Sequence, residues 1–98
     1  ISSISPKGKI IIDDGAKKAL KNGKSLLAAG IKKVLGNFKK GDHVKVLDNK
    51  GKEFARGLSS FSSNEISKIL GCHSNEIRNI LGYVSKSEVI HKDDMVKI

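Results

Sequence analysis

The sequence predicts an α+β fold, a small mixed β pseudobarrel with short helices packed on it. Two observations predict it. Short β-branched runs recur between glycine-containing turns, which is typical of strands that pair into a small closed or nearly closed barrel. One helix pattern follows the first run and two more precede the last runs, which is an α+β order. Ninety-eight residues suffice for one domain with one core.

The first strand and the first helix are predicted in residues 9–23. Lys9-Ile10-Ile11-Ile12 is a β-branched run typical of a strand. Asp13 or Asp14 then suits a helix N-cap, because a carboxylate accepts hydrogen bonds from the free N–H groups there. Asn22-Gly23 ends the helix, with Gly23 in the left-handed conformation.

An apolar segment, residues 25–31, follows this helix, and we expect a core strand or the floor of an anion-binding surface there. Ile31 to Leu35 is predicted as the next strand. Alternation around Val44 and Val46 predicts a half-buried strand, and Asp48 to Gly51 a hairpin turn. Residues 54–58 return as the partner strand, in which Gly57 marks a bulge or a close approach of two backbones.

A repeat of eleven residues follows in residues 63–82. Each unit reads Ser-Asn-Glu-Ile-x-x-Ile-Leu-Gly, which predicts a short helix with a Ser cap, an apolar face and a Gly stop. Ser62 and Glu65 form a possible capping box in the first unit. Residues 89–91 and 95–98 are predicted as the last strands, with Asp93-Asp94 as the turn between them.

The net charge is +9, and most of it lies in the first half of the chain. Residues 1–45 hold eleven Lys and three Asp, which gives +8, whereas residues 46–98 contribute +1. This asymmetry favours a basic face with a polyanionic partner. A solvated, lysine-rich surface without a partner is an alternative that composition alone leaves open.

No set of residues completes a catalytic or metal site. Gly23-Lys24-Ser25 is similar to the end of a phosphate-binding P-loop, but Lys18 stands where that loop needs its first Gly. Cys72-His73 has no second ligand pair at zinc-like spacing. The paired Asp residues sit at element boundaries, where caps and turns need them. No apolar run reaches the ~20 residues of a membrane helix, and a lone cysteine favours the cytoplasm.

Residues 62–83 also resemble a helix-turn-helix, which gives an alternative function as a free-standing DNA-binding protein. Arg78 and Asn79 would read the bases. The segment is neutral, because acidic residues cancel Lys68 and Arg78, whereas an element that docks on phosphates is normally basic. Packing on a sheet is the favoured interpretation of both helices, and DNA is not the expected partner.

Several segments taken together resemble the PUA domain, a small β-barrel module of RNA-modifying enzymes. Leu26 to Ile31 begins the resemblance, and residues 41–46 and 54–57 continue it. Further segments look like the PUA domain that ends bacterial glutamate 5-kinases, namely residues 12–16, 36–38, 81–83 and 89–95. The resemblance covers about residues 8–98, which leaves residues 1–7 as the remnant of a linker.

The glutamate 5-kinase resemblance implies a parent enzyme that phosphorylates glutamate with ATP, the first step of proline synthesis. In that family ATP, Mg and glutamate belong to a kinase domain that precedes the PUA domain, and nothing in this chain matches that domain. We therefore expect no catalytic residue, no metal and no cofactor in this chain, and the kinase domain as a partner.

The PUA resemblance implies structured RNA as a second partner, bound beside the first helix. In RNA-binding relatives the segment that matches Leu26 to Ile31 lies along the RNA groove. The charge asymmetry points to the same part of the chain. The expected RNA-binding residues are therefore Lys17, Lys18, Lys21, Gly23, Lys24, Ser25, Gly30, Lys32 and Lys33.

Overall fold

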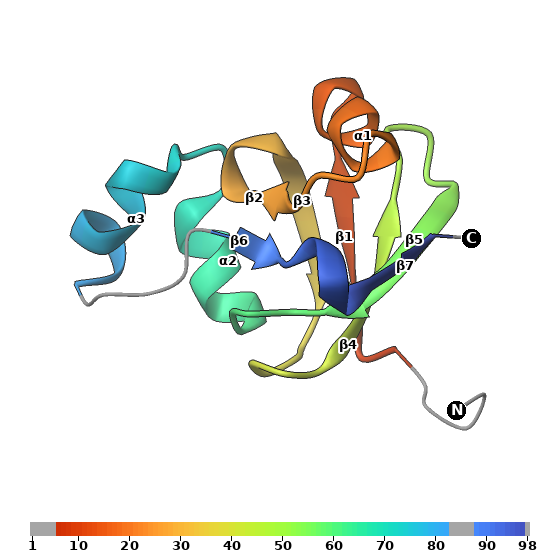
Figure 1. Ribbon diagram of the computed structural model, residues 1–98. Helices are drawn as coiled ribbons and strands as arrows, with labels where there is room; N and C mark the ends of the chain where they lie inside the picture. The colour runs from red at the N-terminus through yellow and green to blue at the C-terminus, as the bar shows by residue number, and fades with distance from the viewer. Residues whose placement is uncertain (1–5, 83–87, 98) are drawn as a thin grey trace.

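A five-stranded mixed sheet and a two-stranded sheet form the framework of the computed structural model, which describes residues 6–82 and 88–97 (Figure 1). The large sheet has the order β3-β1-β4-β5-β7, with bounds Ile31–Gly36, Gly8–Ile12, His43–Leu47, Glu53–Leu58 and Met95–Lys97. Among the strand pairs that the structure describes in this sheet, β1 and β4 run parallel and the others antiparallel. The small sheet pairs β2 (Leu26–Leu27) with β6 (Glu88–Ile90).

The α+β prediction is confirmed, but the barrel is not closed. Within residues 6–82 and 88–97 the strands form two separate sheets and no continuous ring. The strands of the small sheet are two and three residues long, so they cover only part of the large sheet. Helix α2 (Ser63–Ile69) packs against β3, the edge strand of the large sheet.

The core lies on one face of the large sheet. Ile10, Val46 and Ala55 on three neighbouring strands are fully buried, and the residues that alternate with them face outward. Gly57 in β5 allows the last part of the chain to approach, because a Cβ there would lie 2.7 Å from Cγ2 of Ile90. The expected close approach at this glycine is confirmed.

Helix α1 (Asp14–Lys21) has the ends that the sequence predicts. Oδ1 of Asp13 accepts a hydrogen bond from the backbone N–H of Ala16 at 2.7 Å, so Asp13 is the cap. Leu20 is fully buried on the inner face of the helix. Gly23 follows the last turn with a φ of 80°, the left-handed conformation that stops the helix.

The apolar segment after α1 is only partly a strand. Leu26 and Leu27 form β2, and Ala28–Gly30 form the 3-10 helix η1. Of the two alternatives for residues 25–31, a core strand over the whole range is therefore wrong, and the floor of an anion-binding surface stays a prediction. Leu26 and Ala28 are buried, whereas Leu27 is 42% exposed. The run is apolar because the chain changes direction at η1 while Leu26 and Ala28 stay buried in the core.

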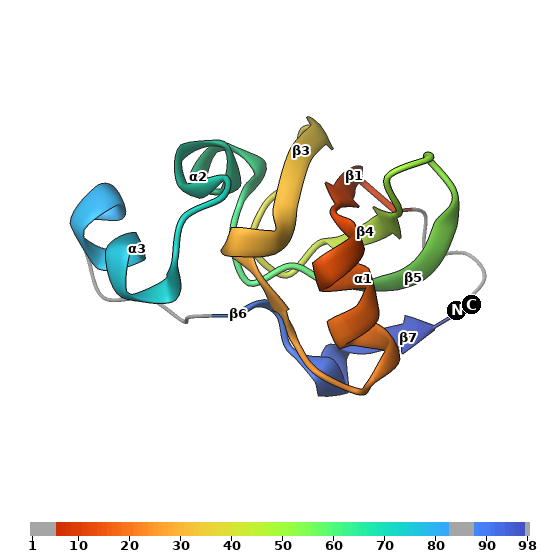
Figure 2. The same cartoon turned by 90° about the horizontal axis from the view of Figure 1, so that it is seen from above.

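The repeat forms two helices with different N-caps. Helix α2 begins with the predicted capping box, in which Ser62 and Glu65 each bond the backbone of the other. Helix α3 (Ser74–Leu81) has His73 at its cap, and no cap side chain bonds the backbone. The predicted Ser cap of the second unit is wrong, because the residue before its first helical residue is His73 and not a second Ser. Figures 1 and 2 place both helices away from β5 and β7.

The last elements return toward α1. The 3-10 helix η2 (Lys92–Asp94) stands where the sequence predicts a turn, and β7 pairs with β5. The segments 1–5, 83–87 and 98 lie outside the described residues. These include most of the expected linker, Tyr83 of the resemblance motif and the end of the last predicted strand.

Two Ile residues at matching positions of the repeat should differ in their effect on stability. Ile69 is fully buried, whereas Ile80 is 39% exposed, so the apolar face predicted for the second unit is only partly buried. Ile69→Ala should lower the free energy of unfolding by about 2–4 kcal/mol. Ile80→Ala should lower it by about 1 kcal/mol or less. Urea unfolding of both variants measures the difference, and equal losses would contradict this packing.

Candidate functional site

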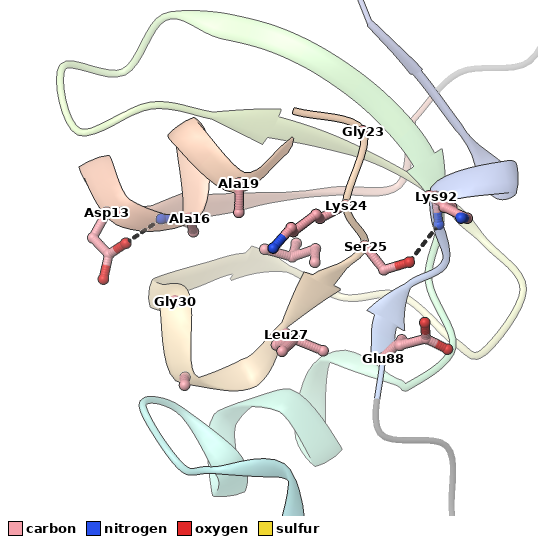
Figure 3. A pocket seen from close by; sticks show the side chains of 13 residues that line it. Asp13, Ala16, Ala19, Gly23, Lys24, Ser25, Leu27, Gly30, Glu88 and Lys92 are labelled. Atoms are coloured by element: carbon pink, nitrogen blue, oxygen red, sulfur yellow. Dashed lines mark hydrogen bonds between the residues drawn. The ribbon is translucent and has the colours of Figure 1, made fainter. Parts of the chain in front are cut away.

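A groove of about 620 Å³ lies between α1 and the segment formed by β2 and η1 (Figure 3). Small side chains form part of its wall, among them Ala16 and Ala19 of α1 and Ala29 of η1, and the leucines of β2 also line it. The side chain of Lys24 extends between the two walls. Largely apolar walls with a cation between them suit a ligand that carries negative charge.

Gly30 sets the depth of this groove. A Cβ on Gly30 would lie 2.4 Å from the Cβ of Ala16, so α1 approaches η1 as closely as two backbones allow. The carbonyl of Gly30 also accepts a hydrogen bond from the backbone N–H of Asp13 at 3.0 Å. Gly30, one of the expected RNA-binding residues, therefore joins two walls of the groove.

The end of the chain completes the groove with residues that the sequence analysis missed. Oγ of Ser25 accepts a hydrogen bond from the backbone N–H of Lys92 at 2.8 Å. This bond holds η2 beside the loop between α1 and β2, so Lys92 lines the groove together with Lys24. No local signal marks Lys92, because the C-terminal half of the sequence is nearly neutral.

A second hollow continues the groove along the same side. Lys24 and Lys92 line both hollows, whereas Lys97 lines the second hollow and not the first. Nζ of Lys97 donates a hydrogen bond to the carbonyl of Lys21 at 3.2 Å, which fixes the end of β7 to the last turn of α1. Three lysines from three elements thus follow one path across the surface. Only Lys24 among them was predicted.

The structure places the nine predicted RNA-binding residues in three different surroundings. Gly23, Lys24, Ser25 and Gly30 line the groove. Lys18 and Lys21 are exposed on α1 beside it. The remaining three point elsewhere: Lys17 and Lys32 bond the hairpin between β4 and β5, and Lys33 pairs with Ile11 on the outer face of the sheet.

Asp48 receives the Lys17 side chain and holds the hairpin. Its Oδ1 accepts hydrogen bonds from the backbone N–H groups of Lys50 and Lys52, and its Oδ2 lies 3.0 Å from Nζ of Lys17. Together these lower the pKa of Asp48 to about 2, with the Lys52 N–H as the largest cause. The Lys17 ammonium also lies 5.8 Å from the ring centroid of Phe54. Lys17 therefore attaches α1 to the sheet.

Two carboxylates give the groove hydrogen-bond acceptors beside its cations. Asp13 and Glu88 line it from opposite sides. Oδ1 of Asp13 is used in the helix cap. Carboxylates can accept hydrogen bonds from hydroxyl or amino groups of a ligand, while Lys24 and Lys92 attract its negative charge.

The described part of the chain holds no cluster of three His, Cys, Asp or Glu side chains that could bind a metal ion. Among the helices described, none has the length and apolar character needed to cross a membrane.

Comparisons with known proteins match this chain to one family. The family model of the PUA domain matches residues 8–81. The chain is 74% identical over all 98 residues to the glutamate 5-kinase of Pelagibacter ubique. It spans only 27% of that relative's length, at its C-terminal end.

Solved structures agree with the family model. A PUA domain protein of Aeropyrum pernix has a TM-score of 0.64 and 24% identity, covering 87% of this chain and 41% of that one. A structure of an H/ACA RNP bound to a substrate RNA contains a chain with a TM-score of 0.61 and 25% identity. The match covers 86% of this chain and 22% of that one.

The contact between Gly30 and Ala16 predicts opposite effects for two substitutions in the groove. Gly30→Ala should destabilise the fold by about 1–3 kcal/mol, because the new methyl group forces α1 away from η1. Gly15→Ala, in the first turn of α1, meets only an ordinary contact at 3.5 Å and should be neutral or stabilising. Thermal unfolding of both variants tests this, and equal losses would contradict the close contact.

The environment of Asp48 predicts a loss of stability in acid. Its folded pKa of about 2 lies below the ordinary value of 3.8, so its contribution is complete above about pH 4 and is lost as the pH falls toward 2. Asp48→Asn should remove this part of the pH dependence. Lys17→Met should remove less of it, since the Lys52 N–H is the larger cause. Urea unfolding between pH 2 and 5 measures both. An equal effect of the two variants would assign the interaction mainly to the ion pair.

Proposed function

The chain belongs to the PUA domain family, and from this premise we propose that it is the non-catalytic C-terminal module of a glutamate 5-kinase and binds structured RNA in the groove beside α1.

The parent enzyme is supported by the 74% identity to a glutamate 5-kinase over the full chain. The chain corresponds to about a quarter of that relative, so glutamate, ATP and Mg would bind in the part that precedes it. The parent would act in the cytoplasm, in proline synthesis, and this module would contribute no group to the phosphoryl transfer.

RNA binding is supported chiefly by Lys24 and Lys92, which converge on one groove from distant parts of the chain. Lys97 extends the basic path along the second hollow, and α1 carries two further exposed lysines, Lys18 and Lys21. An ammonium group lacks the planar fork of Arg and binds phosphate as a point charge. We therefore expect recognition of shape and phosphate in preference to base sequence. The related chain in an RNP with bound substrate RNA adds support by analogy.

A salt titration with an RNA stem-loop tests this proposal. Affinity should fall steeply with salt, because bound lysines release counterions from phosphates. Lys24→Ala and Lys92→Ala should each weaken binding and lower the log–log slope by roughly 0.7–0.9 for each lost phosphate contact. Lys40→Ala is the matched control, since Lys40 is an exposed lysine in the β3–β4 turn and lines neither hollow.

The same titration separates the groove from the helix pair. Arg78 is exposed on α3, and α2 uses Ile66 and Ile69 for packing in the core. Arg78→Ala should leave RNA affinity unchanged. A parallel titration with duplex DNA tests the alternative: if the chain bound duplex DNA sequence-specifically and Arg78→Ala abolished that binding, the helix-turn-helix alternative would be right. If the Lys24→Ala, Lys92→Ala double variant kept both affinity and slope, the groove would not be the RNA site.

A further inference from the structure

Three cations lie side by side on the outer face of the large sheet, away from the groove. The strand register places Lys9 of β1 directly opposite Lys45 of β4, and Lys45 directly opposite Arg56 of β5. All three side chains point away from the core, because Ile10, Val46 and Ala55, the next positions along the same strands, are fully buried. We call Lys9, Lys45 and Arg56 the cationic row.

The cationic row opposes the stability of the sheet that carries it. Like charges directly opposite one another on neighbouring strands repel, since their Cβ atoms are only about 5 Å apart. Glu53 is the acidic partner of the row. Its Oε2 forms a salt bridge with Nε of Arg56, and its Oε1 lies 3.9 Å from Nζ of Lys45. Its pKa is lowered first by the hydrogen bond from Arg56 and then by the charges of Arg56, Lys45 and Lys9. One carboxylate among three cations leaves an excess of +2.

Apolar side chains stand at both ends of the row. Leu35 of β3 is opposite Lys9 and is 37% exposed, and Val96 of β7 is opposite Arg56 and is 71% exposed. The outward face of the sheet thus presents cations between two exposed aliphatic side chains. Aliphatic side chains do not offer the rings on which bases stack, so this pattern fits a protein surface better than RNA.

A hollow beside the row lies where the chain enters the fold. Lys7 and Pro6 line it together with Lys9, Leu35 and Lys45. In the glutamate 5-kinase of Pelagibacter ubique nearly three quarters of the chain lies outside the matched region, and this domain is at the C-terminal end. The preceding part of such a protein is joined to the domain beside the cationic row.

We propose that the cationic row is the docking surface for an acidic face of the kinase region that precedes this domain in the same polypeptide. The proposal rests on the parent enzyme proposed above. A second copy of this face is a poor occupant, because a two-fold contact would bring the two cationic rows together. The row shares no residue with the groove, so docking would leave the RNA site open.

Carbodiimide cross-linking of the full-length protein tests the docking. The reagent activates a carboxylate, and a lysine amine in contact with it then forms an amide while the activating group leaves as a urea. Lys9 and Lys45 should give cross-links to Asp or Glu residues of the kinase region. Lys40, exposed in the β3–β4 turn, is the control and should give none.

A charge reversal separates docking from folding. Lys9→Glu puts an opposite charge beside Lys45, so the melting temperature of the domain should stay equal or rise. In the full-length protein the same substitution should reduce the cross-links from Lys45 several-fold. Lys9→Gln should have an intermediate effect, because it removes one cation and adds no carboxylate.

The result that would overturn the proposal is a full-length protein in which Lys9 and Lys45 give no more cross-links than Lys40. Cross-links that join isotopically labelled and unlabelled copies would point to a second copy and would also overturn it. A third measurement is chemical acetylation of Lys9 and Lys45. If these lysines were protected only when RNA is added, the face would be an RNA-binding surface and the proposal would be wrong. Glutamate-dependent ATP turnover of the same preparation tests the parent enzyme separately, so that failure of the docking and failure of the proposed function are distinguished.

Discussion

The parallel pairing of β1 with β4 is the constraint on which the rest of the structure depends. Parallel neighbours cannot be joined by a tight turn, so the chain must cross over between them. Here the crossover contains α1, β2, η1 and β3, and β3 returns to the free side of β1. Residues 13–30 are thereby placed above the edge of the sheet, with α1 against η1 at Gly30. The groove exists because this crossover has to be accommodated.

The two basic surfaces arise from different parts of this arrangement. The groove is formed by the crossover and by the segment that contains β6 and η2. Its two lysines, Lys24 and Lys92, come from these two different parts of the chain. The cationic row follows directly from strand register and places its cations next to one another. One surface is concave and partly lined by alanine and glycine, whereas the other lies on a sheet face with exposed aliphatic side chains at its ends. Such different shapes suit ligands of different kinds.

Local features were readable from the sequence, and contacts between distant segments were not. The Asp13 cap, the stop at Gly23 and the capping box at Ser62 depend on a few neighbouring residues, so the pattern predicts them. The position of Lys92 in the groove depends on Ser25, and the cationic row depends on register, neither of which a single sequence specifies. The apolar run at residues 25–31 predicts a core strand or the floor of an anion-binding surface, but hydrophobicity reports burial and does not reveal the turn at Ala28–Gly30.

The hydrogen bond between Ser25 and Lys92 spans 67 residues of sequence, which bears on the order in which the protein is made. During synthesis α1 and β2 leave the ribosome long before η2 does. Until Lys92 emerges, Ser25 lacks this partner, β2 lacks its pairing strand β6, and one side of the groove is missing. A growing chain therefore carries an incomplete groove until η2 has emerged. The groove is assembled only after β6 and η2 have left the ribosome, when α1 and β2 have long been exposed outside it.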